Sequence, residues 1–123
     1  MAAYDSILFN PPAPVARVGL RDFRSGKSVS DVPMLIDSGA DLTLIPQASV
    51  DELGPEEGET YELQGFDGRR SLAKSAQLDL VFLARTFRGR FLVVNSPSGI
   101  LGRDVLNHLV VLLDGPGLSW KEQ

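Results

Sequence analysis

The segment Leu35-Ile36-Asp37-Ser38-Gly39-Ala40-Asp41 carries the residue types that a carboxylate-based active site needs. Apolar residues lead directly into Asp37, which predicts a carboxylate at the end of a rigid, buried strand. Ser38 adds a hydroxyl for a hydrogen-bond network, while Gly39 and Ala40 leave space for a substrate. Asp-Ser-Gly is also a common turn tripeptide, so this segment alone does not establish a catalytic carboxylate.

A second segment, Gly99-Ile100-Leu101-Gly102-Arg103-Asp104-Val105-Leu106, lies in the second half of the chain. An arginine at the start of the short helix predicted over 103–109 would ordinarily lie on the surface. Here an apolar run leads straight into Arg103, which favours a structural role for its guanidinium.

Other kinds of site lack the residues they require. The chain has no cysteine, which excludes disulfides, a thiolate nucleophile and every zinc site that uses sulfur. Its single histidine, His108, is paired with no Ser-containing nucleophile elbow or nearby acid, and a surface position at a helix end is favoured. Arg24-Ser25-Gly26-Lys27-Ser28 ends like a phosphate-binding loop but lacks the earlier glycine, which favours a hairpin turn. We therefore expect neither a metal nor a cofactor.

Short strands are predicted to position the two segments. Val15–Arg21 alternates apolar and polar residues, the pattern of a half-buried strand. Val32–Ile36 is an apolar run, and Leu42–Ile45 resumes a strand beyond the Asp-Ser-Gly segment. Gln47–Leu53 is predicted to form a short helix, because Gly54 stands where a helix C-terminus favours glycine.

Hairpins are predicted for the second half of the chain. Polar residues at 56–60 are expected to form a solvated connection, and strands over Tyr61–Gln64 and from Arg70 to Phe82 are expected to flank a tip at Gly65–Gly68. Further strands are predicted at Phe87–Val94, Val110–Leu113 and Leu118–Trp120. Many short strands separated by turns indicate an all-β chain with a closed or nearly closed architecture.

Composition narrows the class of protein. The chain has 123 residues, with 12 basic and 16 acidic side chains and a net charge of −4. This length fits one domain, assigned to residues 15–123, after a proline-containing extended arm at residues 1–14.

Scattered bases and a negative net charge argue against nucleic-acid binding. There is no apolar run of the roughly 20 residues a membrane helix needs and no signal-peptide pattern, so we expect a cytoplasmic protein without a membrane partner.

The two segments together, with a hairpin predicted between them, resemble the retropepsins, the single-domain aspartic proteases of retroviruses and their bacterial and cellular relatives. The resemblance runs from about Val15 to Leu118. It implies the closed-barrel-like acid-protease fold, with a flap hairpin and one or two short helices. It also implies an aspartic endopeptidase, which needs no cofactor and prefers apolar residues around the cut.

The resemblance assigns roles to individual residues. Asp37 is implied to be the catalytic carboxylate, and the Ser38 hydroxyl is implied to tie the two active-site loops together. Gly39 would meet the substrate backbone, and Ala40 would line the pocket.

Further roles follow from the same resemblance. Asp41 would hold the peptide main chain or form a structural ion pair with Arg103, which would brace the loops and support a dimer. The other residues implied to contact substrate are Leu42, Gly65, Phe66, Ile100 and Leu101. Leu42 stands where some retroviral enzymes carry a second acid, which predicts more apolar outer subsites.

The sequence contains a single Asp-Ser-Gly, whereas an aspartic protease uses two carboxylates that share one proton. Asp67-Gly68 and Asp114-Gly115 lack the hydroxyl residue and lie in turn contexts. We therefore expect a two-fold homodimer in which Asp37 meets its own copy, acting on peptide substrates in the acid pH range.

Two alternatives remain open at this stage. The chain could be a catalytically silent retropepsin-like module that binds peptides or only dimerises, since a fold can persist without turnover. It could also be a solitary β-barrel binding module, which would be monomeric at every concentration. Within the enzyme hypothesis, self-processing of the arm at Leu8-Phe9 is a further possibility, and a disordered arm is the plainer one.

Overall fold

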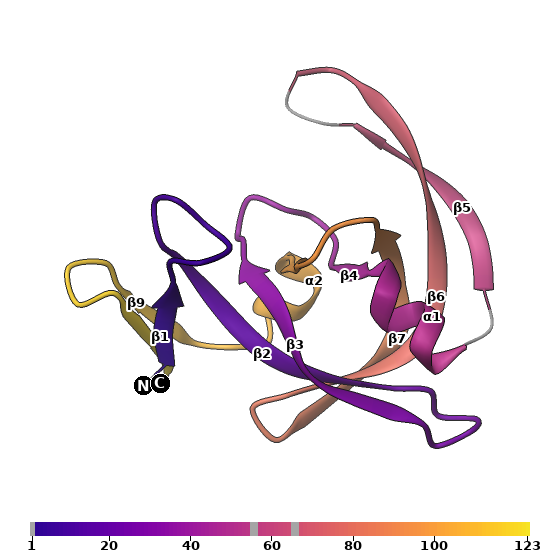
Figure 1. The fold of residues 1–123 in the computed structure, drawn as a ribbon, viewed down its shortest axis with the longest axis horizontal. Coiled ribbons are helices and arrows are strands. Elements are labelled where there is room, and N and C mark those ends of the chain that lie inside the picture. Colours follow the sequence, from indigo (N-terminus) through magenta and orange to yellow (C-terminus); the bar gives the residue numbers. More distant parts are fainter. Residues whose placement is uncertain (1, 55–56, 65–66) are drawn as a thin grey trace.

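The structure is a computed structural model that describes residues 2–54, 57–64 and 67–123. In chain order, the strands described are β1 (Ala2–Asp5), β2 (Ala13–Arg21), β3 (Ser28–Ile36), β4 (Leu44–Pro46), β5 (Glu57–Gln64), β6 (Arg70–Phe82), β7 (Arg85–Val94), β8 (Gly99–Leu101), β9 (Val111–Asp114) and β10 (Ser119–Glu122). Helix α1 (Gln47–Leu53) follows β4, and helix α2 (Arg103–Leu106) follows β8. This confirms an all-β chain with two short helices (Figure 1). No helix in the described ranges is long and apolar enough to cross a membrane.

Six of the strands close on themselves. Neighbouring strands pair in the order β6-β7-β4-β8-β3-β2, and a further pairing between β2 and β6 joins the two ends of this series. In that closing pair, Leu20 lies opposite Leu80. Strand β5 continues the sheet beyond β6, and β1, β10 and β9 continue it beyond β2. The ring confirms the closed architecture expected from the sequence.

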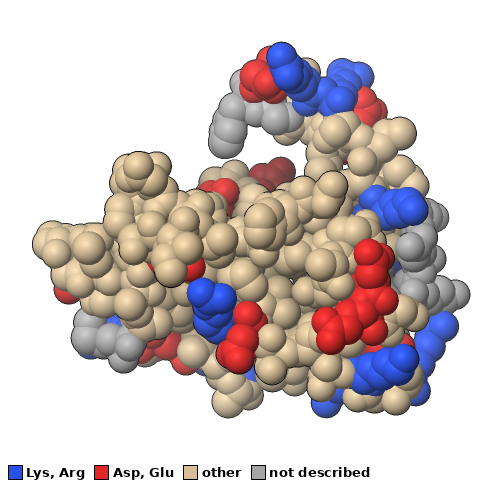
Figure 2. All heavy atoms as spheres, in the orientation of Figure 1, with Lys and Arg blue, Asp and Glu red and all other residues tan. Residues whose placement is uncertain are grey.

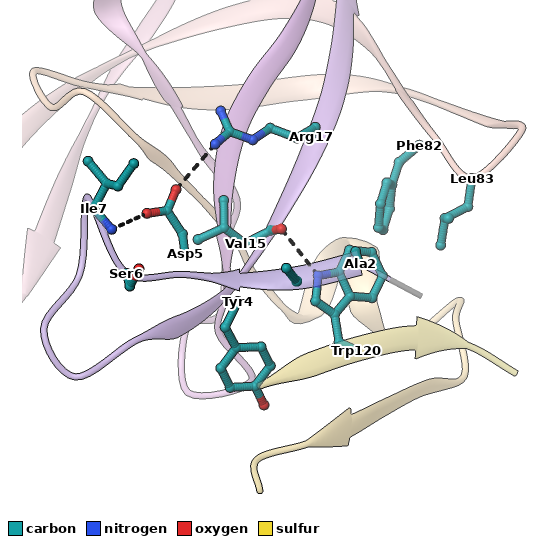
Figure 3. Close-up of a pocket in the computed structure, with 11 residues that line it drawn as sticks. Ala2, Tyr4, Asp5, Ser6, Ile7, Val15, Arg17, Phe82, Leu83 and Trp120 are labelled. Carbon is teal, nitrogen blue, oxygen red and sulfur yellow. Dashed lines mark hydrogen bonds and ion pairs between the residues drawn. The ribbon is translucent and has the colours of Figure 1, made fainter. Parts of the chain in front are cut away.

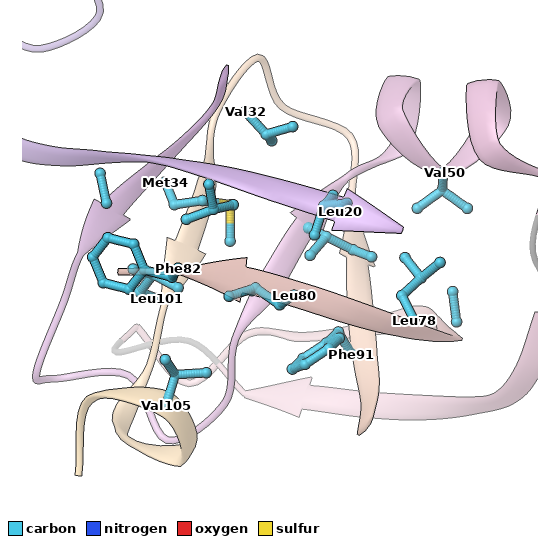
Figure 4. Close-up of a cluster of buried hydrophobic side chains, with 14 of the residues drawn as sticks. Leu20, Val32, Met34, Val50, Leu78, Leu80, Phe82, Phe91, Leu101 and Val105 are labelled. Atoms are coloured by element: carbon cyan, nitrogen blue, oxygen red, sulfur yellow. The ribbon is translucent and has the colours of Figure 1, made fainter. Parts of the chain in front are cut away.

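The interior of the ring holds the hydrophobic core (Figure 4). The alternation in β2 is confirmed, because Ala16, Val18 and Leu20 are buried while Arg17 and Arg21 are exposed. The other core residues labelled in the figure are Val32, Met34, Val50, Leu78, Leu80, Phe82, Phe91, Leu101 and Val105. Helix α1 closes one end of this core and stops at Gly54, which is left-handed (φ 59°), as the sequence predicted.

A buried carboxylate joins three strands of the ring. Asp79 on β6 is fully buried, and it accepts hydrogen bonds from Arg88 of β7 (2.8 Å) and Arg21 of β2 (2.9 Å). The guanidinium of Arg88 also lies over the ring of Phe23, 4.4 Å from its centroid. The hydrogen bond from Arg88, then that from Arg21, holds the pKa of Asp79 below its ordinary value, against the opposing effect of burial.

Several element boundaries differ from the sequence prediction, among them the start of β5 and the end of α2. Residues 57–60 belong to β5 rather than to a solvated connection, because their backbone pairs with β6, for example Thr60 opposite Lys74. Glu56 lies outside the described residues. Helix α2 ends at Leu106, before the predicted Leu109, and Asn107 ends the hydrogen-bonded turn. Polar character alone therefore did not distinguish a strand from a loop.

The first residues of the chain are part of the sheet. Strand β1 lies between β2 and β10, with Ala2 opposite Trp120 and Tyr4 opposite Pro14. The two ends of the chain therefore lie side by side (Figure 1). Strand β2 begins at Ala13, inside the segment assigned to the extended arm.

Candidate active site

The site begins where β8 passes between β3 and β4. Strand β8 runs parallel to β3, with Leu35 opposite Ile100, and antiparallel to β4, with Leu44 also opposite Ile100. Gly99 makes this close passage possible, since a Cβ there would overlap the carbonyl of Leu44 and the sulfur of Met34. Because β8 pairs with both strands, the end of β3 and the start of α2 lie next to each other.

Asp37 is the first residue beyond β3. Its amide donates to the carbonyl of Leu101 (3.1 Å), which fixes the backbone to β8. The Gly39 amide donates to its carboxylate oxygen Oδ1 (2.9 Å), and the Ala40 amide donates to its carbonyl (3.2 Å). A Cβ on Gly39 would stand 3.1 Å from the same Oδ1, so glycine lets the loop fold closely against the carboxylate. The half-buried Asp37 side chain is thus oriented by its own loop.

Arg103 braces this loop from the start of α2. Its guanidinium donates to the carbonyl of Ser38 (2.8 Å) and forms an ion pair with Asp41. Its backbone amide donates to the carbonyl of Ala40 (2.9 Å). One residue therefore holds the Asp37 loop at three points, namely Ser38, Ala40 and Asp41.

The buried residue Thr43 also joins the chain after the Asp37 loop to the start of α2. Thr43 is fully buried, and its hydroxyl donates to Asp104 Oδ1 (2.6 Å) while accepting from the Gly102 amide (3.1 Å). The Thr43 amide donates to the other carboxylate oxygen of Asp104 (3.1 Å). The sequence analysis missed this network. The available signal was a threonine within an otherwise apolar strand and an acid beside Arg103.

Gly102 marks the tightest packing at this junction. A Cβ at this position would stand 2.6 Å from the backbone carbon of Leu42, closer than real side chains approach. The contact is with backbone, which cannot rotate away. Glycine is therefore required for the two loops to meet.

The retroviral aspartyl protease family model matches residues 12–114, most of the chain. The chain belongs to the retroviral aspartyl protease family. Among solved structures, it is similar to the EIAV protease in complex with the inhibitor HBY-793, with 26% identity and a TM-score of 0.59. That match covers 78% of this chain and 86% of the EIAV chain. Among curated proteins, none matches the sequence significantly.

The family assignment gives context to the other residues singled out from the sequence. Leu42 is exposed beside the Asp37 loop, and Ile100 is half-buried. Leu101 has no exposed surface and packs in the core, because successive residues of β8 face opposite sides. It therefore cannot touch a substrate directly, which corrects the role expected for it. Gly65 and Phe66 lie outside the described residues.

The backbone carbonyl and the side chain of Ser38 lie in different surroundings. Its carbonyl accepts the hydrogen bond from Arg103, whereas its side chain is exposed. Within the described part of the chain, the hydroxyl that joins the two loops is that of Thr43. The linking role expected for the Ser38 hydroxyl stays a prediction and would have to involve a second copy.

A hairpin made of β5 and the outer half of β6 projects from the ring and curves over the body (Figure 1). We call this hairpin the flap. Figure 2 shows a hollow beneath it, with carboxylates at the floor and charged side chains gathered on the flap. The described charges there form exposed pairs, Arg69 with Asp67 and Arg70 with Glu62. The hollow is open on the side toward which the flap leans.

A separate cavity of about 560 Å³ lies beneath β1, away from Asp37 (Figure 3). Trp120 forms one wall and donates from Nε1 to the carbonyl of Val15 (3.2 Å). Asp5 forms another wall, where it pairs with Arg17 and accepts from the amides of Ile7 and Leu8 (2.8 Å each). These contacts order the loop that contains Leu8-Phe9, and self-processing there stays a prediction.

Metal binding finds no support in the described ranges, where no group of three His, Cys, Asp or Glu side chains is placed to hold an ion. His108 is exposed near the end of α2, with its ring 6.0 Å from that of Phe87. The groups gathered at the Asp37 loop are instead suited to proton transfer and to binding a peptide backbone.

Proposed function

We propose that this family member is an aspartic endopeptidase that works as a two-fold homodimer. The observation that supports this most directly is the Asp37 carboxylate, held at the end of β3 by the Gly39 amide on a loop braced by Arg103. The chain carries one such carboxylate in an Asp-Ser-Gly sequence. A second copy would supply the other.

In the proposed reaction, the two Asp37 carboxyl groups share one proton. The ionised group takes a proton from a water molecule, whose oxygen attacks the carbonyl carbon of the peptide bond. The protonated group donates to the carbonyl oxygen, giving a tetrahedral diol without a bond to the enzyme. One carboxyl group then donates its proton to the amide nitrogen while the other takes a proton from a hydroxyl of the diol. The carbon–nitrogen bond breaks, and the pair of carboxyl groups again holds one proton.

The residues around Asp37 have proposed roles in holding the peptide. Gly39 presents backbone without a side chain, Ala40 lines the pocket, and Asp41 faces the peptide main chain while paired with Arg103. The exposed side chain of Leu42 and the half-buried one of Ile100 offer apolar surface, which supports a preference for apolar residues. The flap would close over the peptide and exclude water, and substrate contacts by Gly65 and Phe66 are part of this proposal.

The test is cleavage of a mixed peptide library between pH 3 and 7 over a range of enzyme concentrations. We expect cuts that rise faster than linearly with enzyme and disappear in Asp37→Asn. Asp51→Asn is the matched control, because Asp51 is an exposed acid on α1 that contacts Gln47. Folded wild-type enzyme that cuts nothing at any pH would contradict the proposal and favour a silent peptide-binding module.

A further inference from the structure

Helix α2 is too short to hold its own position in the molecule. It contains four residues, about one turn, and isolated helices shorter than about 12 residues are marginal in water. Its position therefore depends on contacts with the rest of the chain. The same contacts affect the candidate active site, because α2 begins with Arg103, which braces the Asp37 loop.

The two ends of α2 are fixed in different ways. At its start, Arg103 and Asp104 bind the chain around the Asp37 loop, and Val105 packs into the core. On the side of β7 the packing is incomplete. A cavity of about 390 Å³ lies between β7 and α2, and Asp104, Val105 and His108 line it on the side of α2. Packing against β7 therefore does not by itself fix the far end of the helix.

Arg85, the first residue of β7, contacts the chain just beyond α2. Its guanidinium donates from Nη1 to the carbonyl of His108 (2.7 Å), which lies two residues past the end of the helix. Its other terminal nitrogen, Nη2, pairs with Glu122 of β10 (3.1 Å). A hydrogen bond from a charged donor is stronger than one between neutral groups. Arg85 thus connects the end of α2 to β7 and to β10.

The backbone of Arg85 is itself held firmly by the ring. Leu83 and Ala84 both have positive φ (53° and 60°), and Phe82 pairs with Arg85 across this turn. Positive φ at both central residues is the type I′ geometry, whose twist matches that of the flanking strands. Phe82 is buried in the core. The guanidinium of Arg85 therefore extends to α2 from a fixed point.

We propose that Arg85 is a positioning residue for Asp37. By holding the His108 carbonyl, it fixes the far end of α2 and so keeps Arg103, at the start of α2, against the Asp37 loop. Without this contact, α2 can tilt toward the adjacent cavity, which loosens the hydrogen bonds that Arg103 donates to the loop. The inference rests on the proposed function, since Asp37 is the carboxylate proposed to act on the peptide.

Peptide cleavage by Arg85 variants tests the kinetic consequence. Arg85→Met removes the donors but keeps an unbranched side chain, and at enzyme concentrations where activity per mole is constant it should lower kcat about 3- to 10-fold with little change in KM. Arg85→Lys keeps the charge and can donate to one of the two oxygens, so it should recover part of this loss. Arg17→Met is the matched control and should keep the wild-type kcat, because Arg17 is similarly exposed (52% against 48%) and pairs with Asp5 instead.

Glu122→Ala distinguishes the two contacts of Arg85. It removes the ion pair with β10 but leaves the hydrogen bond to the His108 carbonyl, so kcat should stay within about twofold of the wild type. A loss of kcat as large as that of Arg85→Met would overturn the proposal, because the effect would then come from the contact with β10. An Arg85→Met variant with unchanged kcat, or one in which only KM rises, would overturn it as well.

Hydrogen exchange of backbone amides, measured by NMR, tests the positioning without any need for activity. The Ala40 and Arg103 amides are hydrogen-bonded at the Asp37 loop (3.2 and 2.9 Å), and both should exchange about 3- to 10-fold faster in Arg85→Met. The amide of Leu80, inside the ring, should keep its wild-type rate. Equal acceleration of all three amides would indicate a general loss of stability and overturn the proposal, as would unchanged rates at Ala40 and Arg103.

The outcomes separate this inference from the proposed function. If Arg85→Met accelerates exchange at the Asp37 loop as expected but the wild type cuts no peptide, Arg85 positions the loop and the proposed function is wrong. If the wild type cuts peptides and Asp37→Asn does not, while Arg85→Met matches the wild type in kcat and in exchange, the proposed function stands and the inference is wrong.

Discussion

The closed ring and the flap are built on the same long strand, β6, yet they are stabilised in different ways. In the ring, β6 contributes Leu78, Asp79 and Leu80, all fully buried. In the flap the same strand carries Leu72, which is 77% exposed, and ion pairs open to water such as Arg70 with Glu62. The ring is therefore fixed by burial and the flap mainly by pairing with β5. The buried ring that supports Asp37 and the exposed flap that is proposed to cover the peptide thus share one strand.

The largest expected effect is the loss of the buried carboxylate of the ring. Asp79→Ala removes the buried carboxylate that accepts hydrogen bonds from the half-exposed guanidiniums of Arg21 and Arg88, and each such charge-assisted hydrogen bond contributes about 1.5–3 kcal/mol. Glu62→Ala in the flap removes an exposed pair with Arg70 and should cost less than about 1 kcal/mol. Urea unfolding of both variants measures the difference. Equal losses would contradict the contrast between ring and flap.

The same carboxylate predicts how stability depends on pH. Because the pKa of Asp79 is lowered in the folded protein, its contribution is present above the unfolded value of about 3.9 and is lost as pH falls through the lower folded value. The urea midpoint of the wild type should fall toward that of Asp79→Asn as pH decreases from 5 to 2. A gap between the two proteins that stays constant over this range would contradict the assignment.

A substitution at Gly102 tests the close contact between the start of α2 and the backbone of Leu42. Gly102→Ala forces a Cβ against the backbone of Leu42, and we expect a loss of about 1–3 kcal/mol. Gly115→Ala is the control, since nothing lies within 4 Å of a Cβ there. Thermal unfolding compares the two variants. Similar melting temperatures would show that the backbone around Leu42 can shift to accommodate a methyl group at position 102.

The Thr43 network predicts an intermediate effect. Thr43→Val keeps the shape but leaves Asp104 and the Gly102 amide without the hydroxyl, which should cost about 1–3 kcal/mol. If the network positions Asp37, peptide cleavage should also show a lower kcat with little change in KM. Thr86→Val, an exposed threonine on β7, is the control. A stable variant with unchanged kcat would contradict a positioning role.

The smallest effect is expected in the flap. Leu72→Ser removes an exposed apolar side chain and should change the free energy of unfolding by no more than about 0.5 kcal/mol. Leu78→Ser, on the same strand inside the ring, should cost several times more than Leu72→Ser because it places a hydroxyl in the core. A large loss of stability in Leu72→Ser would show that the flap packs against the body.

Local patterns were sufficient for the parts of the fold determined by neighbouring residues. The alternation in β2 and the glycine after α1 predicted their elements correctly, and the apolar run before Asp37 predicted a strand end. The contact between Thr43 and Asp104 joins residues 61 positions apart, and no local pattern pairs them. Likewise, the polar start of β5 became a strand because β6 supplies its hydrogen bonds. What could not be predicted depends on partners distant in the sequence.

The position of β1 between β2 and β10 affects the order in which the chain can fold. Ala2 finds its partner in Trp120, near the other end of the chain. During synthesis the first residues emerge long before β10 exists, and contacts of such high sequence separation form slowly. Strand β1 therefore keeps one side unpaired until β10 has been synthesised. A chain shortened before β10 would leave that side of β1 open to other strands.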